Sequence, residues 1–183
     1  MRAYYFDNIP GDQRLPHDSG NSVSNETLRA LHVLHWSISI DDTGSWEHQI
    51  DGVAKERGYK NRDIINVTKK ALGDMYETKL KGFFEEHMHE DEEIRYMLSG
   101  RGYFDIREHS TEAWIRVQLT PGDLLVLPAG IYHRFTLDEN NAAKAMRLFK
   151  DEPKWIPHNR GVDTDANTYR ENYVQSLKGN PAV

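Results

Sequence analysis

The sequence predicts a mainly β protein with flanking helices, built around an antiparallel sandwich or barrel. One observation is the regular recurrence of turn-forming residues in the second half of the chain, at 99–100, 109–110, 120–122, 128–130 and 139–141. The other is that the runs between these turns are short and either apolar or alternating, at 103–106, 114–119, 124–127, 134–137 and 143–149. Several short strands at this spacing are typical of an antiparallel sandwich or barrel.

The first half of the chain is expected to form helices and two short strands. Ser24 is a good N-cap for a helix whose leucines, the last of them Leu34, recur at three-residue spacing. Residues 45–57 have the apolar spacing of an amphipathic helix that ends at a glycine. Asp74 and Glu77 are typical of a capping pair for a helix that runs to residue 84. The remaining expectations are strands at 2–6 and 36–40, a loop from 7 to 21, and helices at 62–67 and 168–177.

Composition limits the classes of function. The chain has 183 residues, the size of one domain, and a formal net charge of -6, which argues against a nucleic-acid partner because phosphate binding requires clustered Lys and Arg. There are no cysteines, so disulfides and thiol catalysis are excluded and any metal must be bound through nitrogen and oxygen. No export signal and no segment long enough to span a membrane is evident. We therefore expect a cytoplasmic protein, with the nucleus as a second compartment.

The chemistry of the chain is concentrated between residues 86 and 107. His87 and His89 alternate along an extended strand, so both imidazoles project to the same side. A straight strand would carry Glu93 about 13 Å past His89 at roughly 3.3 Å per residue, so the chain must turn between them for the two to share an ion. The polar residues 90–92 suit that turn, and the segment after it is expected to form a hairpin of two strands.

A third histidine, His133, follows a Pro-Ala-Gly turn that would deliver it onto a later strand. With His87, His89 and Glu93 it supplies three imidazoles and one carboxylate, which leaves two positions of an octahedron open. Such ligands suit Fe(II), Ni(II), Co(II) or Mn(II) and disfavour Mg²⁺ and Ca²⁺, which prefer oxygen. The other six of the nine histidines have polar or helical surroundings and are interpreted as surface or structural residues.

The two-part pattern H-x-H-x3-E followed by G-x5-P-x-G-x2-H resembles the metal motif of the cupin superfamily. Three longer segments resemble the acireductone dioxygenase family in its eukaryotic form, namely EEHMHEDEEIRYMLSGRGYFDIR, LPAGIYHRFTLDENN and AMRLFKDEPKW. The match runs from about residue 5 to 155. The resemblance implies a cupin double-stranded β-helix, or jelly-roll barrel. It implies one domain over 1–183, with N-terminal elements over 1–80, a metal-binding core over 81–150 and a C-terminal extension over 151–183.

The resemblance also implies roles for individual residues. Arg95 and Arg147 correspond to cations that meet the oxygens of an enediolate, and Phe83 and Phe135 to aromatic walls around a methylthio tail. From the residues alone, Arg95 could instead form a salt bridge with Glu92 or Asp105, and the two phenylalanines could be ordinary core. The implied cofactor is Fe(2+), with Ni(2+) as the alternative metal.

The implied reaction is the O2-dependent cleavage of 1,2-dihydroxy-3-keto-5-methylthiopentene in methionine salvage. The partners we expect are therefore this small-molecule substrate and O2, with the chain acting as a monomer and a second, protein-binding role left open. Two other readings are retained. One is a different metal-dependent cupin oxygenase or isomerase, and the other is a cupin-fold protein that binds a regulatory partner.

Overall fold

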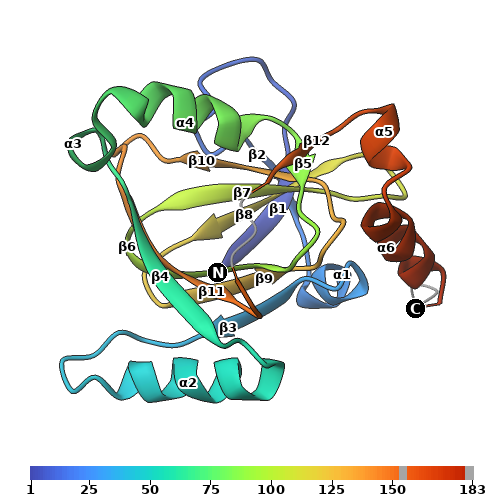
Figure 1. Cartoon of the computed structure of the whole chain (residues 1–183). Helices are drawn as coiled ribbons and strands as arrows, with labels where there is room; N and C mark the ends of the chain where they lie inside the picture. The colour runs from blue at the N-terminus through green and yellow to red at the C-terminus, as the bar shows by residue number, and fades with distance from the viewer. Residues whose placement is uncertain (153–155, 180–183) are drawn as a thin grey trace.

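The computed structural model describes residues 1–152 and 156–179, whose strands form two antiparallel sheets (Figure 1). The seven-stranded sheet has the order β12-β5-β10-β7-β8-β1-β2, and the five-stranded sheet has the order β3-β9-β6-β11-β4. The strands are β1 (Arg2–Phe6), β2 (Asp18–Ser22), β3 (Leu34–Ser37), β4 (Asn61–Val67), β5 (His87–Met88), β6 (Glu93–Gly100), β7 (Gly102–Arg107), β8 (Trp114–Leu119), β9 (Asp123–Leu127), β10 (His133–Leu137), β11 (Ala143–Phe149) and β12 (His158–Asn159). The helices are α1 (Asn25–Ala30), α2 (Ser45–Arg57), α3 (Lys69–Leu72), α4 (Tyr76–Phe84), α5 (Val162–Asp165) and α6 (Thr168–Lys178), with a 3-10 turn, η1, at Gly73–Met75.

The main apolar core draws on both sheets. Ile106, Ile115 and Val117 come from the seven-stranded sheet, and Leu125 and Leu127 come from the five-stranded sheet. All five side chains are buried. Full burial of such a side chain is worth about 1.5–3 kcal/mol. The alternation of apolar residues expected from the sequence therefore holds the two sheets together.

The helices cover the outside of the sheets, as the sequence predicts. Helix α2 packs Ile50 and Val53 against the second apolar core, whose strand residues belong to the five-stranded sheet, and Trp46 stacks on Tyr96 with ring centroids 5.5 Å apart. Figure 1 shows α2 beneath β3 and α4 on the opposite side of the sandwich, beside β10. Helix α6 confirms the C-terminal prediction. None of the helices in the described part of the chain is long and apolar enough to cross a membrane.

The expected hairpin after Glu93 is wrong. Strand β6 pairs with β9 and β11, whereas β7 pairs with β8 and β10, so the two consecutive strands belong to different sheets. The corner between them is Gly100, which has a positive φ of 75° and lies so close to the Ala142 backbone that a side chain would collide with it. Because of this corner, β6 lies in the sheet opposite β7 and β10 instead of pairing with β7 in the same sheet.

Two secondary-structure predictions for the N-terminal part are wrong, because both segments pair with a neighbouring strand. Residues 62–67 form strand β4 instead of a helix, because Ile64, Ile65 and Val67 are β-branched and the strand pairs along the whole of β11. Part of the expected loop forms β2, a short polar edge strand that pairs with β1.

Two boundaries also differ. The first helix ends at Ala30, because His32 takes a positive φ of 60° and turns the chain, so Leu34 begins β3 and the strand expected at 36–40 lies earlier. Helix α4 begins at Tyr76 after a 3-10 turn, and no side-chain hydrogen bond caps it, so the proposed capping pair does not form. The Ser24 cap is confirmed by the bond from the Thr27 N–H to the Ser24 hydroxyl at 3.1 Å.

A buried ion cluster ties β7, β8 and β10 to the N-terminal loop. Asp105 accepts hydrogen bonds from Arg116 at 2.6 and 2.9 Å and from Arg134 at 2.8 Å. Arg116 also donates to the carbonyls of Gln13 and Leu15. Both Arg116 and Asp105 have no exposed surface. Every charge in the cluster therefore has a partner in place of water.

Replacing Asp105 by Asn is expected to lower the free energy of unfolding by about 3–5 kcal/mol, because it leaves the buried Arg116 charge uncompensated. Urea denaturation would measure the change. The matched control is Asp51→Asn, which removes an exposed ion pair with Arg62. Exposed pairs contribute about 1 kcal/mol or less, so the control should be nearly neutral. An equally small loss for Asp105→Asn would show that the buried cluster is not required.

A second buried carboxylate, Asp123, links β9 to β3 and to the start of the chain. It is 2.9 Å from His35 Nε2, 3.1 Å from the Met1 amino group, and accepts the Thr120 N–H at 2.9 Å. Burial raises the pKa of Asp123, but these partners outweigh burial and lower the pKa to about 2.

The pKa of Asp123 makes its contribution to stability dependent on pH. Its folded pKa lies below its ordinary value of 3.8, so the stabilisation is complete above about pH 4 and is lost as the pH falls towards about 2. We expect Asp123→Asn to lose about 2 kcal/mol of unfolding free energy near neutral pH. The difference from the unmodified protein should shrink between about pH 4 and pH 2. Denaturation at several pH values would check this, and a difference independent of pH would contradict it.

Candidate metal centre

The four residues singled out from the sequence converge in one cluster. His87 lies in β5 and His133 opens β10, and the two residues face each other directly across these paired strands. His89 follows β5, and Glu93 then begins β6 in the other sheet. The turn between them therefore brings the carboxylate back to the histidines, as the spacing H-x-H-x3-E requires.

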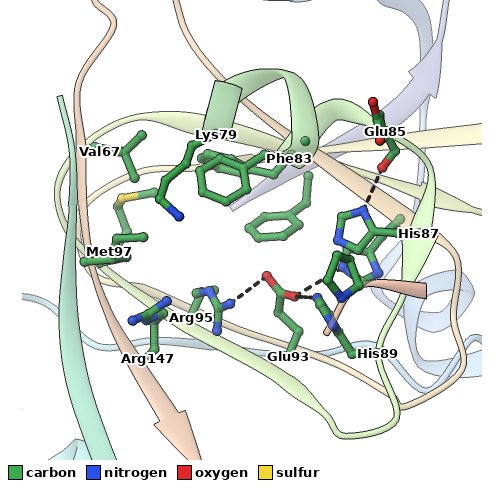
Figure 2. A pocket seen from close by; sticks show the side chains of 18 of the residues that line it. Val67, Lys79, Phe83, Glu85, His87, His89, Glu93, Arg95, Met97 and Arg147 are labelled. Atoms are coloured by element: carbon green, nitrogen blue, oxygen red, sulfur yellow. Dashed lines mark hydrogen bonds and ion pairs between the residues drawn. The ribbon is translucent and has the colours of Figure 1, made fainter. Parts of the chain in front are cut away.

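The cluster is tight and shielded from solvent. One ligand atom from each of the four residues lies within 4.8 Å of the others. The Glu93 Oε2 atom is 3.0 Å from His89 Nε2 and 3.2 Å from His133 Nε2. His87 and His133 are 7% and 2% exposed. Figure 2 shows His87 and His89 on one side of Glu93 and Arg95 on the other.

Each imidazole is oriented by a backbone carbonyl. His87 Nδ1 lies 2.6 Å from the Glu85 oxygen, His133 Nδ1 lies 3.0 Å from the Ile131 oxygen, and His89 Nδ1 lies 3.0 Å from the Ile156 oxygen. A carbonyl can only accept, so Nδ1 carries a proton in all three rings and Nε2 is the nitrogen left to meet the other members of the cluster. Nε2 is also the nitrogen that ligates a metal when Nδ1 is held in this way.

The electrostatics of the cluster follow from burial and from contacts among its members. Burial and, to a smaller extent, the neighbouring His133 together lower the pKa of His87 to about 4. Burial alone would raise the pKa of Glu93, but the Arg95 charge and the hydrogen bonds from the two histidines hold it well below its ordinary value. Glu93 is therefore a buried, charged carboxylate that can neutralise a bound cation.

The two arginines lie side by side on neighbouring strands, since Arg95 of β6 is in register with Arg147 of β11. Arg95 Nη2 is 3.0 Å from Glu93 Oε1, so the expected alternatives of a bridge to Glu92 or Asp105 are wrong. Arg147 makes two hydrogen bonds of 2.7 Å to Asp63 on β4. Both guanidinium groups are thereby fixed on the wall next to the cluster (Figure 2).

A cavity of about 380 Å³ extends from the cluster between the two sheets. Phe83 of α4 and Phe135 of β10 form one wall, with ring centroids 6.2 Å apart at 73°, and Phe104 packs 4.9 Å from Phe135. Away from the cluster the lining is mostly apolar and consists of Ile65, Val67, Met97, Ala143 and Ala145, with Lys79 at the exposed edge. The cavity therefore has a polar end with the histidines and a mostly apolar end without them.

The cavity also uses residues that the sequence reading did not single out. Lys79 lies one helical turn before Phe83, so both face the same side of α4. Ala143 and Ala145 alternate with Arg147 on β11, so all three face the cavity. These periodicities were signals in the sequence. Pro157 and Asn159 reach the cavity from the C-terminal extension, and no local pattern indicates this.

Comparison with known proteins decides the family. The sequence profile of the ARD/ARD′ family matches residues 2–157. A protein of Coprinopsis cinerea named acireductone dioxygenase 1 is 63% identical over 177 residues, which cover 97% of this chain and 98% of the relative. The chain belongs to the acireductone dioxygenase (ARD/ARD′) family. An acireductone dioxygenase of Phaeosphaeria nodorum is 55% identical over 179 residues, covering 98% of each chain.

A solved structure supports both the family and the fold. The acireductone dioxygenase from Bacillus anthracis, with a cadmium ion in its active centre, matches with a TM-score of 0.63 and 27% sequence identity. The match covers 76% of this chain and 93% of the bacterial one. The predicted cupin jelly roll is thereby confirmed, as is the resemblance to the acireductone dioxygenase family on which it rested.

Proposed function

We propose that this chain is the acireductone dioxygenase of methionine salvage and cleaves 1,2-dihydroxy-3-keto-5-methylthiopentene with O2. The observation that carries the proposal is that the His/Glu cluster, two arginines and an apolar end occur together in one cavity. A reductone headgroup and a thioether tail need this combination of a polar and an apolar end. Family membership at 63% identity supports the same reaction.

The donor set fits a transition-metal ion. His87, His89 and His133 can each present Nε2, and Glu93 presents a carboxylate oxygen, all within 4.8 Å. Imidazole nitrogen and carboxylate oxygen together suit Fe(2+) and Ni(2+). We propose these four as the ligands, Fe(2+) as the resident metal and Ni(2+) as the alternative. When bound, the metal would supply Lewis acidity and open positions for the substrate oxygens.

The protein's own residues would bind and orient the substrate. Arg95 and Arg147 lie beside the cluster, where the negative charge of the deprotonated substrate would concentrate, and their fixed positions would stabilise that charge without rearrangement. Phe83 and Phe135 would hold the methylthio tail and exclude water from the reacting carbons. Arg95 would serve both the ligand Glu93 and the substrate, because its guanidinium group presents several donors.

We propose that the bound metal decides the products. The iron form would give formate and 4-methylthio-2-oxobutanoate, and the nickel form 3-methylthiopropanoate, formate and carbon monoxide. None of the four proposed ligands discriminates between the two metals, because histidine and carboxylate suit both.

We further propose that the chain acts as one domain and as a monomer in the cytoplasm, with the nucleus as a second compartment. The single-domain proposal is supported by strand pairing across the chain. Strands from 1–80 pair with strands from 81–150 in both sheets, for example β1 with β8 and β4 with β11. In the same way, β12 of the C-terminal extension pairs with β5.

The ligand set predicts metal binding directly. Metal-free protein should bind one Fe(2+) or Ni(2+) per chain in a calorimetric titration. His133→Ala should weaken binding by more than about 100-fold, since even the loss of a partner behind a ligand typically costs 10–100-fold. His48→Ala is the matched control, because His48 is exposed on α2 and lies outside the cluster. Equal affinities for the two variants would exclude His133 as a ligand.

The reaction is tested by giving acireductone and limited O2 to protein reconstituted with either metal. Iron protein should yield the keto acid, nickel protein should release carbon monoxide, and His133→Ala should abolish both. If the metal binds stoichiometrically but O2 uptake never exceeds the spontaneous rate, the enzyme proposal fails and a cupin-fold binding protein becomes the better account. O2 uptake with another small acid instead would indicate a different cupin oxygenase.

A further inference from the structure

The cavity has a solvent-exposed rim, to which α4 contributes a positive charge. Lys79, Gly82 and Phe83 line the cavity from one face of this helix. Lys79 and Gly82 are exposed while Phe83 is half-buried, so the face runs from solvent into the cavity. Figure 2 shows Lys79 on the Val67 and Met97 side of the cavity, away from His87 and His89. Because Lys79 is exposed and lines the cavity, its side chain lies at the solvent-exposed edge, which we call the mouth, on the side away from His87 and His89.

Lys79 differs from the two arginines of the cavity in its partners. Arg95 is paired with Glu93, and Arg147 is paired with Asp63. Within residues 1–152 and 156–179, no hydrogen bond or ion pair joins Lys79 to another residue. Its charge is therefore not offset by a carboxylate and acts on whatever approaches the mouth.

The chain as a whole is acidic. It has a net charge of -6, and Glu85, an exposed residue that also lines the cavity, accepts a hydrogen bond from Asn159 at 3.1 Å. If the proposed function holds, the substrate must enter such a cavity as a deprotonated reductone. An anion approaching an acidic protein is accelerated where a local positive potential faces it.

We infer that Lys79 is a recruiting residue, which draws the anionic substrate into the mouth of the cavity without taking part in the chemistry. The inference rests on the proposed function, since it names the charge of that substrate. A charge on the rim changes the rate of association and its dependence on salt, and leaves later steps alone. Lys79 should therefore affect kcat/KM at low ionic strength and leave kcat unchanged.

The experiment measures O2 uptake by iron-reconstituted protein with acireductone at two ionic strengths. At about 10 mM salt the Debye length is about 30 Å, and at about 1 M it is about 3 Å, so rim charges act only in the first condition. At low salt we expect Lys79→Gln to lower kcat/KM about 3-fold and Lys79→Glu about 10-fold, with Lys79→Arg close to the unmodified protein. At high salt all four proteins should agree.

The matched control is on the same helix. Lys81 is exposed two residues further on and does not line the cavity, so Lys81→Gln and Lys81→Glu make the same charge changes away from the mouth. They should alter kcat/KM much less than the Lys79 variants do at low salt.

The possible outcomes separate a failure of the inference about Lys79 from a failure of the proposed function. If the unmodified protein shows no turnover of acireductone, the proposed function has failed and the inference falls with it. If turnover is normal but the Lys79 variants match the Lys81 variants, the inference alone is overturned. A loss that persists at high salt, or that appears in kcat, would also overturn it, because it would show a role in packing or chemistry instead of recruitment.

Discussion

The site depends on the contacts of one buried carboxylate. Glu93 begins a strand of the five-stranded sheet, yet its two oxygens meet His133 from the other sheet, His89 from the segment after β5, and Arg95 from its own strand. Burying a charge is costly unless it is paired and hydrogen-bonded, and here all its partners are side chains of the site. The carboxylate can therefore occupy this position only when both sheets are correctly placed, so assembly of the sandwich and of the cluster are one event.

The corner at Gly100 makes that arrangement possible. Because the chain crosses from one sheet to the other between β6 and β7, residues close in sequence end on opposite walls of the cavity. β6 contributes Arg95 and Met97, while β7 contributes Phe104 and pairs with β10, which carries His133 and Phe135. A hairpin would have put these two strands side by side in one sheet and left the five-stranded wall without its ligand.

The convergence of the four candidate ligands was easier to predict from the sequence than the path of the chain. The alternation of His87 and His89 and the turn before Glu93 are local, so their geometry follows from strand periodicity alone. The β-branched residues were a local signal for the strand at 61–67, but its pairing with β11 involves residues about eighty positions away, and local pattern cannot report that. The carbonyls that orient the imidazoles were likewise unpredictable, since a backbone oxygen carries no residue-specific signal. One of them, on Ile156, is 67 residues from its histidine.

The C-terminal extension holds the ligand segments in place although the family profile ends at residue 157. The Ile156 carbonyl fixes the His89 ring, and β12 pairs with the strand that carries His87. Gly130, in the turn before His133, donates its N–H to the His89 carbonyl and is covered so closely by Tyr169 of α6 that only glycine fits. Arg170 donates to the carbonyl of the same glycine. The motif thus supplies the ligand atoms. Ile156, β12 and α6 hold the segments that carry the three histidines, and so orient them towards the cluster.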